Sequence, residues 1–367
     1  MLPIINNEIE IKDALKREDL VFIDVRSPGE YALNKIPGAL NVPLFNNEER
    51  EELGIVYKDA GSAVAQRKGL EFAVPKLTRL VDHIETISGE KIPALYCWRG
   101  GLRSSSLSYI LQLAGMKVFY VKGGYKAYRR FINHSLQNYR LQPQPIILHG
   151  LTGTGKTLIT KKLIQRGYAA LDLERLACHR GSVFGQIGFH HRPSQKNFDG
   201  MLWQQLEKIQ HFPYVVIEKE GNKMGPLFLP QFLVNAMEEG IHILLKSSPE
   251  VRARRIVEEY VGGKLTEREK EEFRQGIEQL TPRLGKKRSN ELIKLLEENN
   301  YYEAALILCR DYYDRLYPDA RPDRYDFSAQ FNTDNLEEAT DGIIDYIYQF
   351  IKNGELQKSN SSVPIKG

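Results

Sequence analysis

The sequence predicts an α/β protein that contains two parallel-sheet domains in succession and ends in a helical portion. First, 367 residues exceed the length at which one hydrophobic core keeps growing. Second, short apolar runs alternate with amphipathic stretches, as in parallel strands joined by helices. Third, a stretch rich in proline and glutamine interrupts this alternation. These observations predict a first domain, a linker, a second domain, a helical portion and a disordered tail at 1–137, 138–145, 146–265, 266–353 and 354–367.

In the first domain, strands and helices are expected to alternate along the chain. Buried strands are predicted at 21–25, 94–97 and 117–121. Apolar residues spaced three and four apart indicate amphipathic helices at 76–88 and 105–114. Because parallel strands need crossover helices of this kind, we expect a parallel sheet.

The second domain repeats this pattern and then becomes helical. Its strands are predicted at 145–149, 169–173, 214–218 and 241–245, with a helix at 158–165 after the first of them. From 267 to 351 the sequence is charged and its leucines follow helical spacing, as at Leu292, Leu295 and Leu296. We therefore expect helices throughout this last portion.

The composition is typical of soluble globular proteins. Hydrophobic residues make up 42% and charged residues 27% of the chain, and no segment has the roughly 18 consecutive apolar residues of a membrane span. Residues 1–13 lack the basic start and apolar stretch of a signal peptide. The three cysteines are widely spaced and form no Cys-x-x-Cys pair, which argues against a disulfide framework and a zinc site. We expect a cytoplasmic protein that does not contact membranes.

A turn rich in glycine and arginine follows the predicted strand 94–97, and a helical pattern begins directly after it. Backbone N–H groups in such a turn and the N-terminus of a helix create positive potential, which would hold the thiol of Cys97 as the reactive thiolate. A small buried cysteine is the alternative, but it would not explain the glycines and arginines beside it. We therefore predict an accessible catalytic thiol in an anion-binding loop that comprises Cys97, Arg99, Gly100, Gly101 and Arg103.

The second domain opens with a phosphate-binding motif. Residues 150–157 read GLTGTGKT, which matches G-x-x-x-x-G-K-[ST] between a predicted strand and a predicted helix. The glycines allow backbone N–H groups to surround a polyphosphate, the lysine adds charge, and the hydroxyl of Thr157 could hold Mg²⁺. The motif does not choose between a nucleotide and another diphosphate. The predicted phosphate-binding residues are Gly150, Gly153, Thr154, Gly155, Lys156 and Thr157.

Acidic residues stand near the ends of two predicted strands of the second domain. Asp172 and Glu174 lie at the end of one strand, and Glu218 and Glu220 at the end of the next. Such carboxylates could position a metal ion or a water molecule, or they could be ordinary wet strand ends.

The net charge of +4 is too small to indicate a nucleic-acid-binding protein by itself. Basic residues nevertheless concentrate in two runs. These runs could bind phosphates, or they could be solvated surface. They comprise residues 252–255 and the group Arg283, Lys286, Lys287 and Arg288.

The first third of the chain resembles the rhodanese superfamily. Residues 24–31 (DVRSPGEY) and 36–43 (IPGALNVP) are similar to its two N-terminal signatures, and Cys97 corresponds to its active-site cysteine. Five residues separate Cys97 from Arg103, as in cysteine phosphatases, whereas common sulfurtransferase loops are one residue shorter. Phosphatase chemistry is therefore an alternative, although Tyr96 stands where phosphatases have a histidine and no aspartic general acid is placed beside it.

Nearly the whole chain resembles the tRNA 2-selenouridine synthase family. The resemblance rests on the cysteine loop, the phosphate loop and three further motifs: HRGSVFG at 179–185, EKE at 218–220 with Met224-Gly225 after it, and RLG at 283–285. It implies a rhodanese-like domain followed by a P-loop NTPase-like domain. It also implies a transferase acting on tRNA, which converts 2-thiouridine at the wobble position to 2-selenouridine through S-geranyl-2-thiouridine, with geranyl diphosphate and selenophosphate as co-substrates.

Binding of tRNA would need a basic surface that contacts phosphates, for which the candidates are Arg180, Arg283, Lys286, Lys287 and Arg288. A different interpretation is a rhodanese-type sulfurtransferase, or a Cys-x5-Arg phosphatase, fused to a nucleotide-dependent kinase or ATPase that acts on small molecules. A third is a non-catalytic interaction protein, against which the intact Cys97, Lys156 and Thr157 argue.

Overall fold

The computed structural model describes residues 7–189, 192–316 and 325–352. Its internal packing divides the chain into two compact units. Unit 1 comprises Met1–Asn138 together with Ser194–Met201, and unit 2 comprises Tyr139–Pro193 together with Leu202–Gly367. Residues 194–201 thus group with unit 1, although the sequence pattern assigns them to the second domain. The tail predicted at 354–367 lies outside the described residues.

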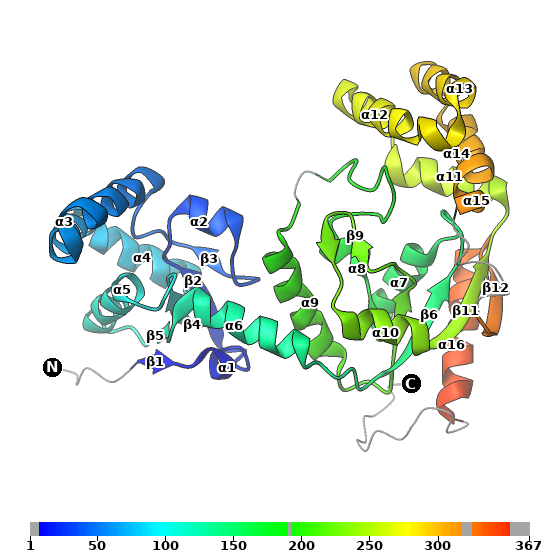
Figure 1. The fold of residues 1–367 in the computed structure, drawn as a ribbon. Coiled ribbons are helices and arrows are strands. Elements are labelled where there is room, and N and C mark those ends of the chain that lie inside the picture. Colours follow the sequence, from blue (N-terminus) through cyan, green and yellow to red (C-terminus); the bar gives the residue numbers. More distant parts are fainter. Residues whose placement is uncertain (1–6, 190–191, 317–324, 353–367) are drawn as a thin grey trace. The chain divides into compact units, whose positions relative to one another are not determined.

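Unit 1 contains a five-stranded parallel sheet in the order β1-β5-β4-β2-β3 (Figure 1). The strands are β1 (Glu8–Ile9), β2 (Leu20–Asp24), β3 (Leu40–Asn41), β4 (Ile92–Tyr96) and β5 (Phe119–Val121). The helices are α1 (Ile11–Ala14), α2 (Pro28–Leu33), α3 (Asn47–Ala73), α4 (Leu77–Ser88), α5 (Leu102–Leu113) and α6 (Gly124–Gln137), with a 3-10 turn at Val74–Lys76. Helix α3 is interrupted at Gly61, where φ is +82°. The sheet confirms the α/β class predicted for this part of the chain.

The apolar positions that predict the helices of unit 1 form its core. Leu107 and Leu111 of α5 are buried together with Ile23 of β2 and Leu95 of β4. Strand β4 lies inside the sheet, between β5 and β2, and is buried over most of its length. This burial is typical of parallel strands that are covered by helices on both faces. It fixes the position of Cys97, which directly follows β4.

Unit 2 contains a second five-stranded parallel sheet, in the order β12-β11-β6-β8-β7, and a short antiparallel pair of strands, β9 and β10. Its strands are β6 (Gln144–His149), β7 (Ala170–Leu171), β8 (Tyr214–Glu218), β9 (Lys223–Met224), β10 (Leu227–Phe228), β11 (Ile241–Lys246) and β12 (Phe327–Asn332). The helices before β11 are α7 (Lys156–Gln165), α8 (Leu173–Ala177), α9 (Gln195–Ile209) and α10 (Gln231–Glu239). The first half of α9, residues 195–201, groups with unit 1. The phosphate loop follows β6, an inner strand.

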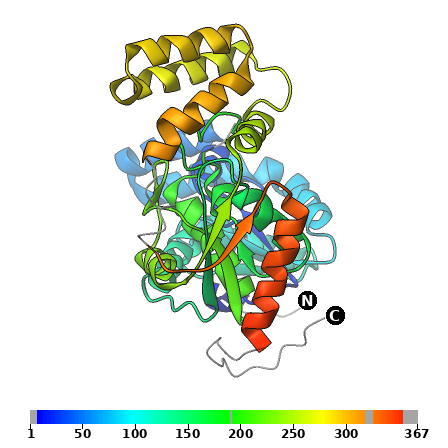
Figure 2. The ribbon, with the colours of Figure 1, turned by 90° about the vertical axis from the view of Figure 1, so that its right-hand side faces the viewer.

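The helical portion predicted at 266–353 is interrupted by a strand. Helix α11 (Pro249–Tyr260) precedes this portion. The helices within it are α12 (Glu267–Leu284), α13 (Lys286–Glu297), α14 (Tyr301–Leu308), the π-helical Cys309–Tyr313, α15 (Asp314–Leu316) and α16 (Leu336–Lys352). Strand β12 returns to the sheet as an edge strand parallel to β11, and α16 packs beside it (Figure 2). The prediction of helix throughout was wrong at this point because β12 is short and apolar on one face only, with a burial that alternates from residue to residue.

No helix in the described residues is long and apolar enough to cross a membrane.

Candidate active sites

The cysteine loop connects the carboxyl end of β4 to the first turn of α5, and main-chain contacts fix its shape. Tyr125, at the start of α6, donates its N–H to the carbonyl oxygen of Cys97 at 2.8 Å. Gly100 has a φ of +64°, and a Cβ atom on it would lie 2.5 Å from the carbonyl oxygen of Val121. Only glycine allows this approach of two main-chain segments. Gly100 therefore serves the packing of the loop against the turn before α6, whereas a Cβ atom on Gly101 would meet nothing within 4 Å.

The thiol of Cys97 lies beneath this loop. Only 4% of the residue is exposed. Its Sγ atom accepts a hydrogen bond from the hydroxyl of Ser104 at 3.3 Å and lies 3.8 Å from the carbonyl oxygen of Gly101. The expectation of an accessible thiol is not met in this structure, because Cys97 is buried in the hydrophobic core of unit 1 together with Val25, Leu95 and Leu107.

The two arginines of the cysteine loop differ in their surroundings. Arg99 is exposed. Arg103 donates from Nη1 to Oε2 of Glu30 at 2.8 Å, and Arg50 lies 3.5 Å from the same oxygen. Burial opposes ionisation of Glu30, but the hydrogen bond from Arg103 and the positive charges of Arg103, Arg50 and Arg26 together outweigh it, so the pKa of this carboxyl is lowered. An anion that enters the loop would therefore compete with Glu30 for Arg103.

The phosphate loop joins β6 to α7. Gly153 has a φ of +81°, and a Cβ atom on it would lie 2.8 Å from the carbonyl oxygen of Arg252. Lys156, the first residue of α7, donates from Nζ to the carbonyl oxygen of Gly150 at 2.7 Å. The ammonium group therefore lies inside the loop, where the motif predicts that phosphate oxygens bind.

Two arginines of α11 support the phosphate loop. Arg252, only 2% exposed, donates from Nε to the carbonyl oxygen of Thr152 at 2.8 Å and pairs with Asp314 at 2.6 Å. Arg255, 9% exposed, donates to the carbonyl oxygen of Thr154 at 3.3 Å. Arg252 is neither part of a phosphate-binding surface nor solvated, because its guanidinium group is buried and holds a main-chain oxygen of the loop. Arg255 holds the loop and also lines the phosphate cavity.

Three carboxyl groups meet beside the phosphate loop. Ligand oxygens of Glu174, Glu218 and Glu220 all lie within 4.8 Å of one another. The hydroxyl of Thr157 lies 2.9 Å from Oε2 of Glu174 and 3.0 Å from Oε2 of Glu218. Because a hydroxyl has a single hydrogen, only one of these contacts can be a bond that it donates unless a carboxyl carries a proton. The hydroxyl of Thr157, the last residue of the phosphate motif, thus contacts two of the three glutamates, Glu174 and Glu218.

The electrostatics of this cluster favour protonated carboxyls. Burial raises the pKa of Glu174 to about 8, and the nearby Glu220 adds to the effect. Burial also raises the pKa of Glu220 to about 7 and that of Glu218 well above its usual value. Oε1 of Glu218 is buried and has no hydrogen-bond partner within the described residues. These are groups that a cation would stabilise in their charged form.

Asp172, the remaining predicted acidic residue, has a different role. Its Oδ1 accepts the N–H of Arg175 at 2.9 Å, so Asp172 caps the N-terminus of α8. It is buried, and its charge helps to raise the pKa of Glu218, but it is not one of the three residues whose ligand atoms meet.

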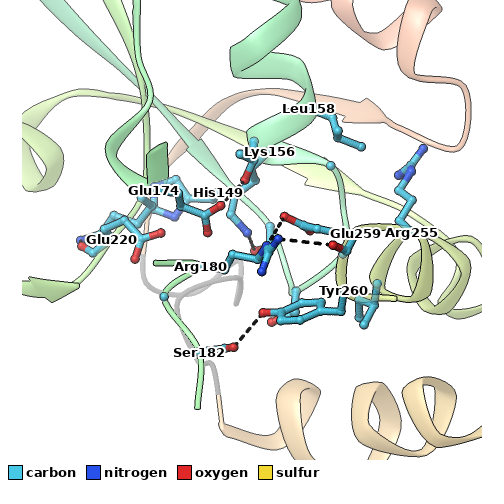
Figure 3. A pocket seen from close by; sticks show the side chains of 18 of the residues that line it. His149, Lys156, Leu158, Glu174, Arg180, Ser182, Glu220, Arg255, Glu259 and Tyr260 are labelled. Carbon is cyan, nitrogen blue, oxygen red and sulfur yellow. Dashed lines mark hydrogen bonds and ion pairs between the residues drawn. The ribbon is translucent and has the colours of Figure 1, made fainter. Parts of the chain in front are cut away.

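The phosphate loop, Glu174 and Glu220 line a cavity of about 150 Å³ (Figure 3). Arg180 lies between Glu220 on one side and Glu259 on the other. Its Nε pairs with Glu259 at 3.0 Å, and its guanidinium group lies 4.7 Å from the ring centre of Tyr260. Arg180 is thus part of the cavity wall. Other residues that line the cavity are His149, Ser182, Lys219, Arg255 and Ile256.

The motif at 179–185 packs against the glycine after β9, and this packing positions Arg180. The ring of His179 lies between Gly185 and Gly225, since a Cβ atom on either glycine would come within 2.7 Å of the ring. His179 also accepts the N–H of Gly181 at 3.0 Å. Burial lowers the pKa of His179. This neutral ring is therefore a packing centre that joins two distant motifs.

The basic residues predicted at the end of α12 and the start of α13 lie away from the cavity wall. Arg283, Lys286 and Lys287 are exposed. Arg288 pairs with Glu291 at 2.8 Å and with Asp311 at 2.6 Å, so its charge is already compensated. The structure therefore leaves three of the five proposed tRNA-binding residues on an exposed turn, and places Arg180 in the phosphate cavity.

Sequence reasoning missed the far wall of the cavity. Glu259, Tyr260 and Ile256 come from the end of α11, about 100 residues after the phosphate motif in the sequence. Ser182 donates to or accepts from the hydroxyl of Tyr260 at 3.0 Å. The only signal for this wall was that the 179–185 motif carries polar residues in a segment without regular structure.

Comparison with known proteins agrees with this architecture. The family model described as a tRNA 2-selenouridine synthase AAA domain matches residues 143–340, and that of the rhodanese-like domain matches residues 8–131. A tRNA 2-selenouridine synthase from a Sulfurovum species is 34% identical over 80% of this chain and 87% of its own length. One from Cupriavidus pinatubonensis is 33% identical over the same shares.

A crystal structure described as the N-terminal domain of an ATP/GTP-binding protein from Clostridium difficile 630 is 39% identical and covers 34% of this chain and 97% of its own, with a TM-score of 0.33. The two family models together account for both units, and the relatives named above align over most of their length. This chain belongs to the tRNA 2-selenouridine synthase family.

Proposed function

We propose that the protein is a transferase that converts 2-thiouridine at the wobble position of tRNA to 2-selenouridine, with geranyl diphosphate and selenophosphate as co-substrates. The relatives are named for this modification of tRNA. The observation that carries the proposal is the phosphate loop, whose Lys156 lines one cavity together with Glu174 and Glu220. It supports a diphosphate-dependent step in an enzyme of this family.

In the first step, the phosphate cavity binds geranyl diphosphate. Lys156 exchanges its bonds to the loop carbonyls for bonds to phosphate oxygens, and the N–H groups of the loop take the remaining ones. The sulfur of 2-thiouridine then bonds to the first carbon of the geranyl group, whose bond to oxygen breaks. Diphosphate leaves with the bonding electrons, and the base loses its N3 proton to water. Electrostatic stabilisation of the leaving diphosphate is the contribution of this site.

The residues beside the loop fit Mg²⁺. The hydroxyl of Thr157 and carboxylate oxygens of Glu174, Glu218 and Glu220 are hard oxygen donors, and the buried Oε1 of Glu218 lacks a partner among the described residues. When bound, the ion would neutralise charge on the diphosphate. Asp172 would support this site through α8 without contacting the ion.

In the second step, the cysteine loop handles selenium. Selenium from selenophosphate bonds to C2 of the base, the geranyl thiol leaves, and the bond between phosphorus and selenium breaks by addition of water. We assign to Cys97 the handling of selenophosphate or of the selenium it delivers, with Arg99 and Arg103 on its anionic part and Gly100 and Gly101 shaping the loop. Because only 4% of Cys97 is exposed in this structure, this role requires its sulfur to become accessible to the anion.

The exposed residues Arg283, Lys286 and Lys287 are our candidates for contact with tRNA phosphates. We expect Arg288 to contribute less, since two carboxylates already neutralise it. Arg180 is better placed to contact the diphosphate than the backbone of tRNA.

The proposal is tested by mass spectrometry of the nucleosides of 2-thiouridine-containing tRNA after incubation with the protein and both co-substrates. We expect 2-selenouridine with both, and S-geranyl-2-thiouridine with geranyl diphosphate alone. Unchanged nucleosides, with turnover of ATP or of a phosphate ester in the absence of tRNA, would instead support a kinase, ATPase or phosphatase.

A further inference from the structure

A second cavity, of about 60 Å³, lies in the helical portion of unit 2 next to the phosphate cavity. The two cavities share two wall residues, Ile256 and Tyr260 of α11. The second cavity reaches into the hydrophobic core formed by α12, α13, α14 and the segment around Phe184. Its other lining residues are aliphatic or aromatic and include Val257, Leu265, Ile277, Leu292, Leu296, Ala304, Ala305 and Leu308.

Tyr260 marks the border between a polar and an apolar compartment. In Figure 3 its ring lies at the edge of the phosphate cavity, with Arg180 and Ser182 beside it and the helices of the C-terminal portion beyond it. Its hydroxyl is bonded to Ser182, and one face of the ring is covered by the guanidinium group of Arg180. The ring also packs near Phe273 of the apolar cavity. A ligand that extends past Tyr260 would pass from the charged lining of the phosphate cavity to the apolar lining of the second cavity.

The lining of the second cavity favours a hydrocarbon chain over a nucleotide base. The hydroxyl of Tyr260 is bonded to Ser182, and that of Tyr301 donates to Asn299 at 2.6 Å. A base that entered here would leave polar edge atoms without hydrogen bonds, which is costly in an apolar site. A branched hydrocarbon carries no such groups and gains from burial.

We propose that this cavity is the binding site for the hydrocarbon tail of a prenyl diphosphate, whose two phosphates occupy the loop at 150–157. The inference rests on the proposed function, and it adds the place where the tail lies and the chain length that fits. Native cores are close-packed, so an unfilled apolar space that adjoins an anion-binding cavity is unusual unless a ligand occupies it.

The size of the cavity limits the chain. A space of about 60 Å³ is smaller than the engineered cavity of about 150 Å³ that accommodates benzene. It therefore takes the end of a chain, while the carbons nearest the diphosphate lie between Ile256 and Tyr260. A ten-carbon chain spans both regions, whereas a fifteen-carbon chain would force α12 to α14 apart.

Binding of four probes by calorimetry in Mg²⁺ tests the inference: inorganic diphosphate, and the dimethylallyl, geranyl and farnesyl diphosphates. Burial of each CH₂ group strengthens binding about fourfold. Since the small cavity buries only about three or four such groups, we expect geranyl diphosphate to bind on the order of 100-fold more tightly than inorganic diphosphate. The dimethylallyl compound should lie between them, and farnesyl should gain no more.

Two variants locate the tail. Ala305→Leu should fill the cavity and remove most of the advantage of geranyl over inorganic diphosphate, while inorganic diphosphate binds as before. Leu308→Ala should enlarge the cavity and raise the affinity for farnesyl diphosphate relative to geranyl diphosphate. Tyr302→Leu, on an exposed position of the same helix, is the matched control and should change neither ratio.

Each outcome separates the inference from the function on which it rests. If inorganic diphosphate binds and geranyl diphosphate binds no more tightly, or if Ala305→Leu and Leu308→Ala leave the ratios unchanged, the tail site is refuted and the phosphate site stands. Tighter binding of ATP than of geranyl diphosphate would also refute the tail site. If no diphosphate binds, both proposals fall.

Discussion

The two anion loops occupy the same place in their sheets but are held in different ways. Each leaves the carboxyl end of an inner parallel strand and enters a helix. The cysteine loop is held by the main chain at the start of α6, against which only a glycine fits at position 100. The phosphate loop is held by the buried guanidinium groups of Arg252 and Arg255. A loop fixed by side chains can be loosened by one substitution that leaves its own motif intact.

The loops also differ in access. Lys156 lines an open cavity, whereas Cys97 is 4% exposed and bonded to Ser104. The phosphate loop is thus shaped to receive its ligand, and the cysteine loop must open first. We expect two separable chemical steps, one at each loop, and substitutions that abolish one step while leaving the other.

Among the variants, Cys97→Ser is expected to separate selenium incorporation from geranylation most completely. This change removes the thiol and keeps the size of the side chain, so selenium incorporation should fall below detection while geranylation continues. Nucleoside mass spectrometry of the treated tRNA measures both. Cys178→Ser is the control, since this cysteine lies outside the loop. Loss of both activities together would indicate a structural role for Cys97.

For Lys156→Ala, geranylation is the step that should be lost. Loss of charge-assisted hydrogen bonds should weaken binding of geranyl diphosphate by about 10- to 100-fold and abolish geranylation under limiting substrate. Lys161→Ala, an exposed position on the same helix, should bind as the wild type does. Geranylation at the wild-type rate in the Lys156 variant would refute the assignment of the phosphate loop.

Arg252→Ala tests the difference in how the loops are held. It leaves the carbonyl oxygen of Thr152 and the carboxylate of Asp314 without their partner, which should destabilise unit 2 by about 2–3 kcal/mol. Diphosphate binding should weaken too, because the loop loses its support. Denaturant unfolding and calorimetry measure these effects, and the exposed Arg254→Ala should cause neither. A stable Arg252 variant with normal binding would show that the loop holds its own shape.

The smallest effect is expected from the exposed basic turn. Neutralising Arg283, Lys286 and Lys287 together should lower the slope of log affinity for tRNA against log salt by roughly 2–3, since each lost phosphate contact removes about 0.7–0.9. Neither reaction should change at saturating tRNA.

Three scattered exposed lysines provide the matched control, because their loss changes the net charge equally. The triple replacement Lys12→Gln, Lys58→Gln and Lys161→Gln should leave the slope nearly as it is. Equal slopes for both triple variants would exclude the basic turn as a tRNA contact.

The sequence predicts those parts of the molecule whose signals are local. Strands β2, β4, β6, β8 and β11 are continuous apolar runs, and the motif at 150–157 lies between a strand and a helix as expected. Strand β12 was not predicted because only one of its faces, which carries Phe327, Ala329 and Phe331, is partly buried. A two-residue pairing such as β1 has no sequence signal of its own and exists through its neighbour β5.

Features that depend on tertiary contact could not be predicted. The grouping of Glu174 with Glu218 depends on the pairing of β8 with β6 and on the position of α8. The sequence of an arginine run on a helix does not indicate whether its side chains are solvated or buried. The support that Arg252 and Arg255 give the loop is therefore seen only in the folded chain. The burial of Cys97 has the same cause, since the residues that pack with it, such as Ile23, Val42 and Ile84, are distant in the sequence.

The most direct test of two separable steps supplies both variants, Lys156→Ala and Cys97→Ser, with the intermediate that lies between the steps. Transfer RNA that already carries S-geranyl-2-thiouridine is incubated with selenophosphate and the Lys156→Ala protein, and its nucleosides are analysed by mass spectrometry. The account predicts 2-selenouridine at close to the wild-type level, and none with Cys97→Ser. Failure of the Lys156→Ala protein to convert this tRNA, although it binds it normally, would contradict the division of work between the two loops.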